Sequence, residues 1–132
     1  MIFGGAVLLV LAGLAWVRLA PHDTARWHQP LRYDQNTDFS GGAFRVAEAG
    51  PDALQRADQH MRALDRTVVL AGSVEEGRVT YVTRSKVFGF PDYTTIEVRD
   101  GHIRAWGRLR FGTSDLGVNR DRLEQIPVFA KT

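Results

Sequence analysis

The stretch "TTIEVRDGHIRAW", residues 94–106, decides the fold, because polar and apolar residues alternate on both sides of an Asp-Gly pair. Alternation with a period of two is typical of a strand that buries one face. Asp100 and Gly101 suit the central positions of a type I′ turn, where both residues need positive φ. The stretch therefore predicts an antiparallel hairpin.

The same alternation continues upstream of this hairpin in "TVVLAGSV", residues 67–74, and in "RVTYVTRSKVF", residues 78–88. Together these segments predict an antiparallel four-stranded meander. In its last strand Ile103 and Ala105 point toward a core, so Arg104 and its alternate neighbours point to the opposite side. Residues 42–50 are a candidate for a further short edge strand.

Two helices are expected beside these strands. Leu54, Ala57, Met61 and Leu64 repeat at spacings of three and four, which predicts a helix with one apolar face. A shorter helix is expected near Asn119, whose side chain suits an N-cap. We therefore predict one α+β domain over residues 43–132, with helices covering one face of the meander.

The first twenty residues are strongly apolar. Residues 2–17, "IFGGAVLLVLAGLAWV", carry no charge, and the apolar stretch extends to residue 20 if Arg18 snorkels. A bilayer core needs about 20 residues. We predict a transmembrane anchor or uncleaved signal at residues 1–20, with a cleaved signal peptide as the alternative. Residues 21–42 mix Pro, Gly, Asp and Asn without periodicity, which predicts a linker.

Composition narrows the chemistry. The chain has no cysteine, which excludes disulfides, thiolate catalysis and cysteine-bound metals. Its four histidines form no metal-binding pair in the sequence, so neither a metal nor a cofactor is expected. The formal net charge of +2 is too small to predict a nucleic-acid partner.

Two loops carry the candidate functional residues. "VFGFPDYTT", residues 87–95, predicts a wide turn, because Pro91 cannot donate to a central ladder and Gly89 permits a bend. Its aromatic side chains either belong to the core or line a groove beside Trp106. "GTSDLGVN", residues 112–119, leads from a strand into a helix N-terminus, where free amides favour an anion. The alternative is that its polar side chains only satisfy turn amides.

The candidate residues fall into two sets, and none is assigned as catalytic. Those expected to bind an anion are Arg84, Lys86, Trp106, Arg108, Arg110, Ser114, Asp115, Asn119 and Arg120. Those of the aromatic turn are Phe88, Phe90, Asp92 and Tyr93.

Residues 66–98, "RTVVLAGSVEEGRVTYVTRSKVFGFPDYTTIEV", followed by "SDLGVNRDRLE", resemble the domain of unknown function 1499 family. The resemblance covers residues 52–124, and its most characteristic pieces are "FGFPDY", residues 88–93, and "SDLGVNR", residues 114–120. The family's usual "SRS-x-G" stands here as "RLRFG", residues 108–112. Members are small bacterial or plastid domains, often behind a membrane anchor or lipid-attachment signal, and no activity is attached to them.

The resemblance implies an exported domain. Together with the anchor expected at residues 1–20, this predicts a single-pass inner-membrane protein with a periplasmic C-terminal domain. The arginines that follow the apolar segment favour the cytoplasmic orientation instead. Our leading hypothesis is a non-enzymatic domain, tethered through its N-terminal helix, that binds an anionic lipid, a small molecule or a protein partner at the cell envelope. The alternatives are a hydrolase-like enzyme on a membrane-associated substrate, using Asp92 or Asp115, and a scaffold subunit of a membrane protein complex.

Overall fold

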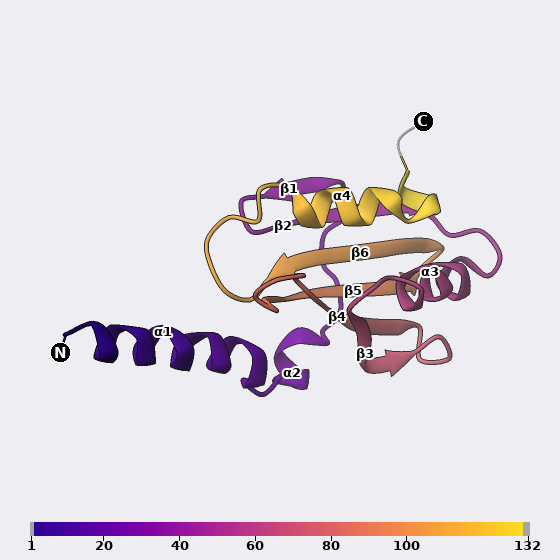
Figure 1. Cartoon of the computed structure of the whole chain (residues 1–132). Helices are drawn as coiled ribbons and strands as arrows, with labels where there is room; N and C mark the ends of the chain where they lie inside the picture. Colours follow the sequence, from indigo (N-terminus) through magenta and orange to yellow (C-terminus); the bar gives the residue numbers. More distant parts are fainter. Residues whose placement is uncertain (1, 131–132) are drawn as a thin grey trace.

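The computed structural model describes residues 2–130, and Figure 1 shows its helices and strands in chain order. The elements are α1 (Ile2–Leu19), α2 (Thr24–Trp27), β1 (Thr37–Phe39), β2 (Gly42–Glu48), α3 (Ala53–Arg62), β3 (Thr67–Ser73), β4 (Arg78–Arg84), β5 (Pro91–Arg99), β6 (His102–Leu109), α4 (Val118–Gln125) and the 3-10 helix η1 (Pro127–Phe129). Met1 and residues 131–132, the outermost residues of the predicted anchor and domain, lie outside the described residues.

The strands form one antiparallel sheet of six, in the order β1-β2-β6-β5-β4-β3. Strands β3 to β6 pair in chain order, and Asp100 and Gly101 turn β5 into β6 with φ angles of 54° and 76°. Strand β2 pairs with the other side of β6 along its whole length and carries β1 at the sheet edge. The predicted four-stranded meander is therefore wrong, because such a meander would leave the backbone groups of β6 unpaired on the side that β2 occupies.

One face of the sheet is covered by α3, α4 and η1, which lie together on that side in Figure 1. Alternate residues of β5 and β6, such as Ile96 and Ile103, pack there against Met61 of α3 and Leu123 of α4. Gly107 of β6 allows α4 to lie close, because a Cβ at this position would come within 2.8 Å of the Asn119 side-chain oxygen. The helices thus make the larger core and bring the start of α4 directly onto β6.

The opposite face of the sheet is covered by residues 20–33, most of the segment predicted as a linker. The indole of Trp27 stacks on the ring of Tyr93, with centroids 4.0 Å apart and planes 10° from parallel. The Leu31 amide donates to a carboxylate oxygen of Glu97. Trp27 and Leu31 are only 7% and 2% exposed. This segment is therefore part of the packed domain.

The predicted transmembrane anchor is wrong. Within residues 2–130, no helix of the structure has both the length and the apolar character needed to cross a bilayer. The prediction let Arg18 snorkel and counted residues up to 20, but the Arg18 guanidinium donates to the Val87 carbonyl (2.8 Å) and Ala20 is buried against the domain. The predicted membrane partner and single-pass inner-membrane localisation, with its periplasmic domain, are corrected by the same finding.

Replacing Trp27 by Ala should lower the free energy of unfolding by about 3 to 5 kcal/mol, because it removes the stacked indole and uncovers Tyr93. Chemical denaturation of the full-length chain measures this change. Trp16→Ala is the matched control. Trp16 is 58% exposed on α1, so its loss should change stability by no more than about 0.5 kcal/mol. Similar losses in the two variants would show that residues 20–33 add little to the fold.

Candidate functional site

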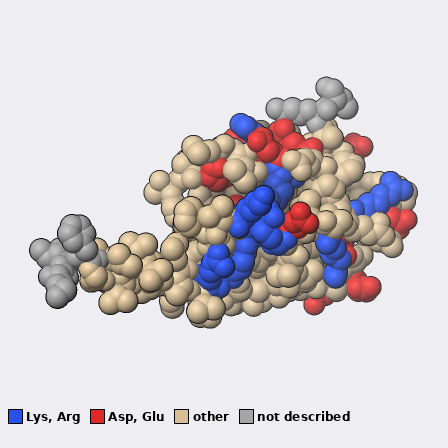
Figure 2. All heavy atoms as spheres, viewed as in Figure 1, with Lys and Arg blue, Asp and Glu red and all other residues tan. Residues whose placement is uncertain are grey.

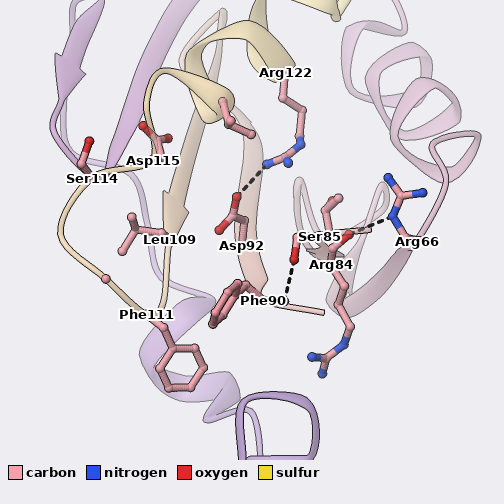
Figure 3. Close-up of a pocket in the computed structure, with 13 residues that line it drawn as sticks. Arg66, Arg84, Ser85, Phe90, Asp92, Leu109, Phe111, Ser114, Asp115 and Arg122 are labelled. Atoms are coloured by element: carbon pink, nitrogen blue, oxygen red, sulfur yellow. Dashed lines mark hydrogen bonds and ion pairs between the residues drawn. The ribbon is translucent and has the colours of Figure 1, made fainter. Parts of the chain in front are cut away.

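A cavity of about 620 Å³ opens between the ends of β4, β5 and β6 and the start of α4 (Figure 3). We call it the β5–α4 cavity. Its lining residues are Arg66, Thr83, Arg84, Ser85, Phe90, Asp92, Leu109, Phe111, Gly112, Ser114, Asp115, Val118 and Arg122.

The register of the sheet places the floor of this cavity. Asp92, the second residue of β5, is opposite Thr83 of β4 and Leu109 of β6. Side chains of paired residues point to the same face of a sheet, so these three lie side by side on the face that carries the helices. Tyr93, the next residue of β5, points to the other face and stacks on Trp27.

The loop before α4 forms one wall and is organised by Asp115. Its carboxylate accepts hydrogen bonds from the amides of Gly117 (2.9 Å) and Asn119 (3.0 Å) and from the Asn119 side chain (2.8 Å). Burial opposes ionisation of Asp115, but these hydrogen bonds outweigh it and lower its pKa. Asn119 was expected to be the N-cap. It lies instead inside α4, and Asp115 accepts from its amide.

Asp92 lies close to Asp115, but its pKa is shifted in the opposite direction. Its Oδ2 atom has two donors, Arg122 Nη1 and Asn119 Nδ2, each at 3.4 Å. Burial raises the pKa of Asp92, and the nearby Asp115 raises it further, while the contacts from Arg122 and Asn119 oppose the change without cancelling it. The Asn119 amide thus bridges Asp92 and Asp115, two carboxylates whose spacing in the sequence gave no reason to expect contact.

The remaining walls of the cavity are apolar on one side and cationic on the other (Figure 3). The apolar surface comes from Phe90, Leu109 and Phe111, which Figure 3 labels, and from Val118. Arg122 and Arg66 supply guanidinium groups on the other side.

Arg84 also lines the cavity, but its guanidinium is engaged elsewhere. It donates to the carbonyls of Gly89 (2.9 Å) and Val17 (3.3 Å) and lies 3.3 Å from His22 Nε2. Figure 3 shows it directed away from Asp92. Arg84 therefore adds its backbone and the stem of its side chain to the wall.

The sheet divides the residues predicted to bind an anion. Trp106 and Arg108 are on the face that residues 20–33 cover, away from the cavity. Arg108 is 6% exposed and donates to Thr95 Oγ1 (2.9 Å) and to the carbonyls of Trp106 (3.0 Å) and Trp27. Burial lowers the pKa of Arg108 to about 9. This arginine holds the covering segment in place.

The other predicted residues are spread around the molecule. Arg84, Phe90, Asp92, Ser114 and Asp115 line the cavity, and Asn119 contacts two of them. Lys86 and Phe88 are exposed in the turn, Arg110 donates to the Tyr93 hydroxyl (3.2 Å), Arg120 pairs with Asp121 (3.2 Å), and Tyr93 is buried beneath Trp27.

Several cavity residues were not identified from the sequence. Arg66 lies at the junction of a helix and a strand, where an arginine carries no functional signal. In the sequence, Arg122 is a basic residue that follows the 112–119 loop, and nothing indicated a contact with Asp92. Its spacing of three from Asn119 places both residues on one side of α4. Among residues 2–130, no three His, Asp or Glu side chains are grouped so that they would hold a metal ion.

The two aspartates should respond to pH in opposite ways. Ionised Asp92 costs the folded state free energy, so the wild-type protein should lose stability relative to Asp92→Asn as the pH rises from about 3.8, the ordinary pKa, through the raised pKa of the folded state. Ionised Asp115 stabilises the fold. Asp115→Asn should therefore be less stable than wild type near pH 7, and the difference should shrink as the pH falls through the lowered pKa of Asp115.

Urea denaturation of the wild type and both variants between about pH 3 and about pH 7 measures these differences. Each variant is the control for the other, because the substitution is the same and the carboxylates share Asn119. Parallel pH profiles would contradict the distinct states assigned to the two groups.

Comparison with known proteins yields a family match. No curated protein and no solved structure is significantly similar to the chain. A family model described as "Protein of unknown function (DUF1499)" matches residues 18–127, which include residues 20–33 as well as both motifs. The match confirms the resemblance and covers most of the sequence, so the chain belongs to the DUF1499 family.

Proposed function

We propose that this domain binds a small amphiphilic molecule in the β5–α4 cavity. The observation that carries the proposal is the meeting of the two family motifs at one concave site, Phe90 and Asp92 from the first and Ser114, Asp115 and Val118 from the second. The volume of about 620 Å³ is within the range of roughly 300 to 1,000 Å³ that is typical of small-molecule pockets.

The division of the walls supports an amphiphile. Phe90, Phe111 and Val118 offer an apolar surface for the body of a ligand, while Asp92 and Arg122 offer polar groups for its head. Such pockets combine a mostly apolar lining with a few polar groups that orient the ligand. A concave site of this size also suits a small molecule better than a protein partner, which needs about 800 Å² on each side.

A second candidate function is acid–base catalysis by Asp92. The favouring observation is a cavity-lining carboxylate whose pKa is raised by burial, beside an arginine. Carboxylates tuned in this way are frequent among catalytic acids and bases. Asp115 does not fit this role, because amides saturate its carboxylate and lower its pKa.

Binding is tested by calorimetric titration of the full-length chain with octyl amphiphiles that differ only in headgroup. Val118→Trp fills the mouth of the cavity from the exposed start of α4 and should weaken binding at least about tenfold, or 1.4 kcal/mol. Val128→Trp is the matched control, because Val128 lies in η1 and lines a different hollow.

Two results would contradict the binding proposal. One is that no octyl amphiphile binds the wild-type chain. The other is equal binding by the two tryptophan variants, which would locate the amphiphile elsewhere, for example on the apolar surface of α1.

Catalysis is tested on p-nitrophenyl octanoate, an ester with the same apolar body. If Asp92 is an acid or base, Asp92→Asn should lower the rate of p-nitrophenol release about a hundredfold or more without weakening octanoate binding comparably. Equal rates in the wild type and the variant would remove this second candidate.

A further inference from the structure

We infer that the headgroup of the ligand is an oxyanion, held between the guanidinium groups of Arg66 and Arg122. This inference rests on the proposed amphiphile binding and specifies its chemistry. It concerns the side of the sheet where Ser114 and Asp115 of the predicted anion set lie, and not the side of Trp106 and Arg108.

The charges of the cavity favour an anion. The guanidinium groups of Arg66 and Arg122 line it against two aspartates, Asp92 and Asp115, while the Arg84 guanidinium is bound outside the cavity. The negative charge of Asp115 is already compensated by the amides at the start of α4, and Asp92 faces Arg122. The cavity therefore retains positive charge. In Figure 2, Lys and Arg side chains gather in the middle of the face that is also shown in Figure 1, with Asp and Glu side chains beside them.

Arg66 is positioned but not neutralised. Its Nε atom donates to the Arg84 carbonyl (3.0 Å), and its backbone is in the left-handed region with φ of 54°, which is uncommon for a residue other than glycine. Within the described part of the chain it makes no ion pair. The terminal nitrogens of its guanidinium therefore remain available at the cavity rim, where Figure 3 shows them.

Arg122 is also only partly engaged. Its Nη1 atom donates to Asn119 Oδ1 at 2.8 Å, but its contact with Asp92 is 3.4 Å long. A guanidinium carries five N–H donors in a planar fork and binds carboxylate or phosphate oxygens with two of them at once. An oxyanion can thus bind Arg122 without breaking its bond to Asn119.

The polar groups beside these arginines are compatible with an oxyanion. The Ser114 hydroxyl accepts from the Leu116 amide (3.3 Å) and keeps its own proton for donation, whereas the Thr83 hydroxyl is bonded to Thr67. The raised pKa of Asp92 means that this carboxyl takes up a proton more readily than usual, which would reduce its repulsion of a second anion. A cationic headgroup, in contrast, would meet two arginines with free donors.

The test is calorimetric titration of the full-length chain with octyl sulfate, octyl phosphate, octanoate, octyl glucoside and octyltrimethylammonium. We expect the three oxyanions to bind at least about tenfold more tightly than the neutral and cationic amphiphiles, because charge-assisted hydrogen bonds are the stronger ones. The comparison of octanoate with octyl phosphate distinguishes a fatty-acid headgroup from a phosphate headgroup.

Arg66→Gln and Arg122→Gln should each weaken oxyanion binding about tenfold and weaken octyl glucoside binding less. Arg66 is exposed and its side chain donates one hydrogen bond, to the Arg84 carbonyl, so loss of the guanidinium should leave the fold intact. Arg56→Gln, which removes an exposed arginine of α3 outside the β5–α4 cavity, is the matched control and should bind like the wild type.

The outcomes separate this inference from the proposal beneath it. If the oxyanions bind no better than the other amphiphiles, or if Arg66→Gln binds them like Arg56→Gln, the oxyanion assignment is wrong while amphiphile binding stands. If no amphiphile binds at all, the proposed function itself fails.

Discussion

The stack of Trp27 on Tyr93 is the contact on which the rest of the architecture depends. The central strands β5 and β6 carry buried residues on both faces, but the helices α3 and α4 cover only one of them. The second face is covered by residues 20–33, which include the short helix α2 and whose carbonyls accept hydrogen bonds from buried side chains of the sheet. Arg108 is the clearest case, since its guanidinium donates to Trp27 and lies against the rings of Trp27 and Trp106 at 5.4 and 4.4 Å. A charge buried in this way is tolerated because carbonyls and ring faces receive it.

Closure of that face determines where a ligand can reach the sheet. The Arg108 guanidinium is bound to the N-terminal segment, whereas Asp92 and Arg122 line the β5–α4 cavity beside α4. The "FPDY" motif serves both faces, because Asp92 points into the β5–α4 cavity while Tyr93 points to Trp27. One short motif therefore supports the packing of the N-terminal segment and lines the candidate site. Two consecutive residues, Asp92 and Tyr93, carry these two roles.

The N-terminal segment also contacts the turn that bounds the cavity. The Arg84 guanidinium links the carbonyls of Gly89 and Val17, and Arg18 donates to Val87 in the same turn. Phe90, which follows these residues, is part of the apolar wall. These hydrogen bonds connect the end of α1 to the turn that positions Phe90. The shape of the cavity therefore depends on α1, which is distant in sequence from both motifs.

The sequence by itself determined what acts over a few residues. Alternation and the Asp-Gly pair identified the strands between residues 67 and 109, the spacing of Leu54, Ala57 and Met61 identified α3, and the two motifs identified the family. Only the tertiary structure decided the six-stranded sheet, because pairing of β2 with β6 depends on which strand edge is free. It also decided that Arg18 binds the domain, that residues 20–33 cover the sheet, and that Arg66 and Arg122 line the same cavity as Asp92. Strand periodicity shows that a strand has two faces but not what covers each of them, and residues separated by dozens of positions meet only when the whole chain packs.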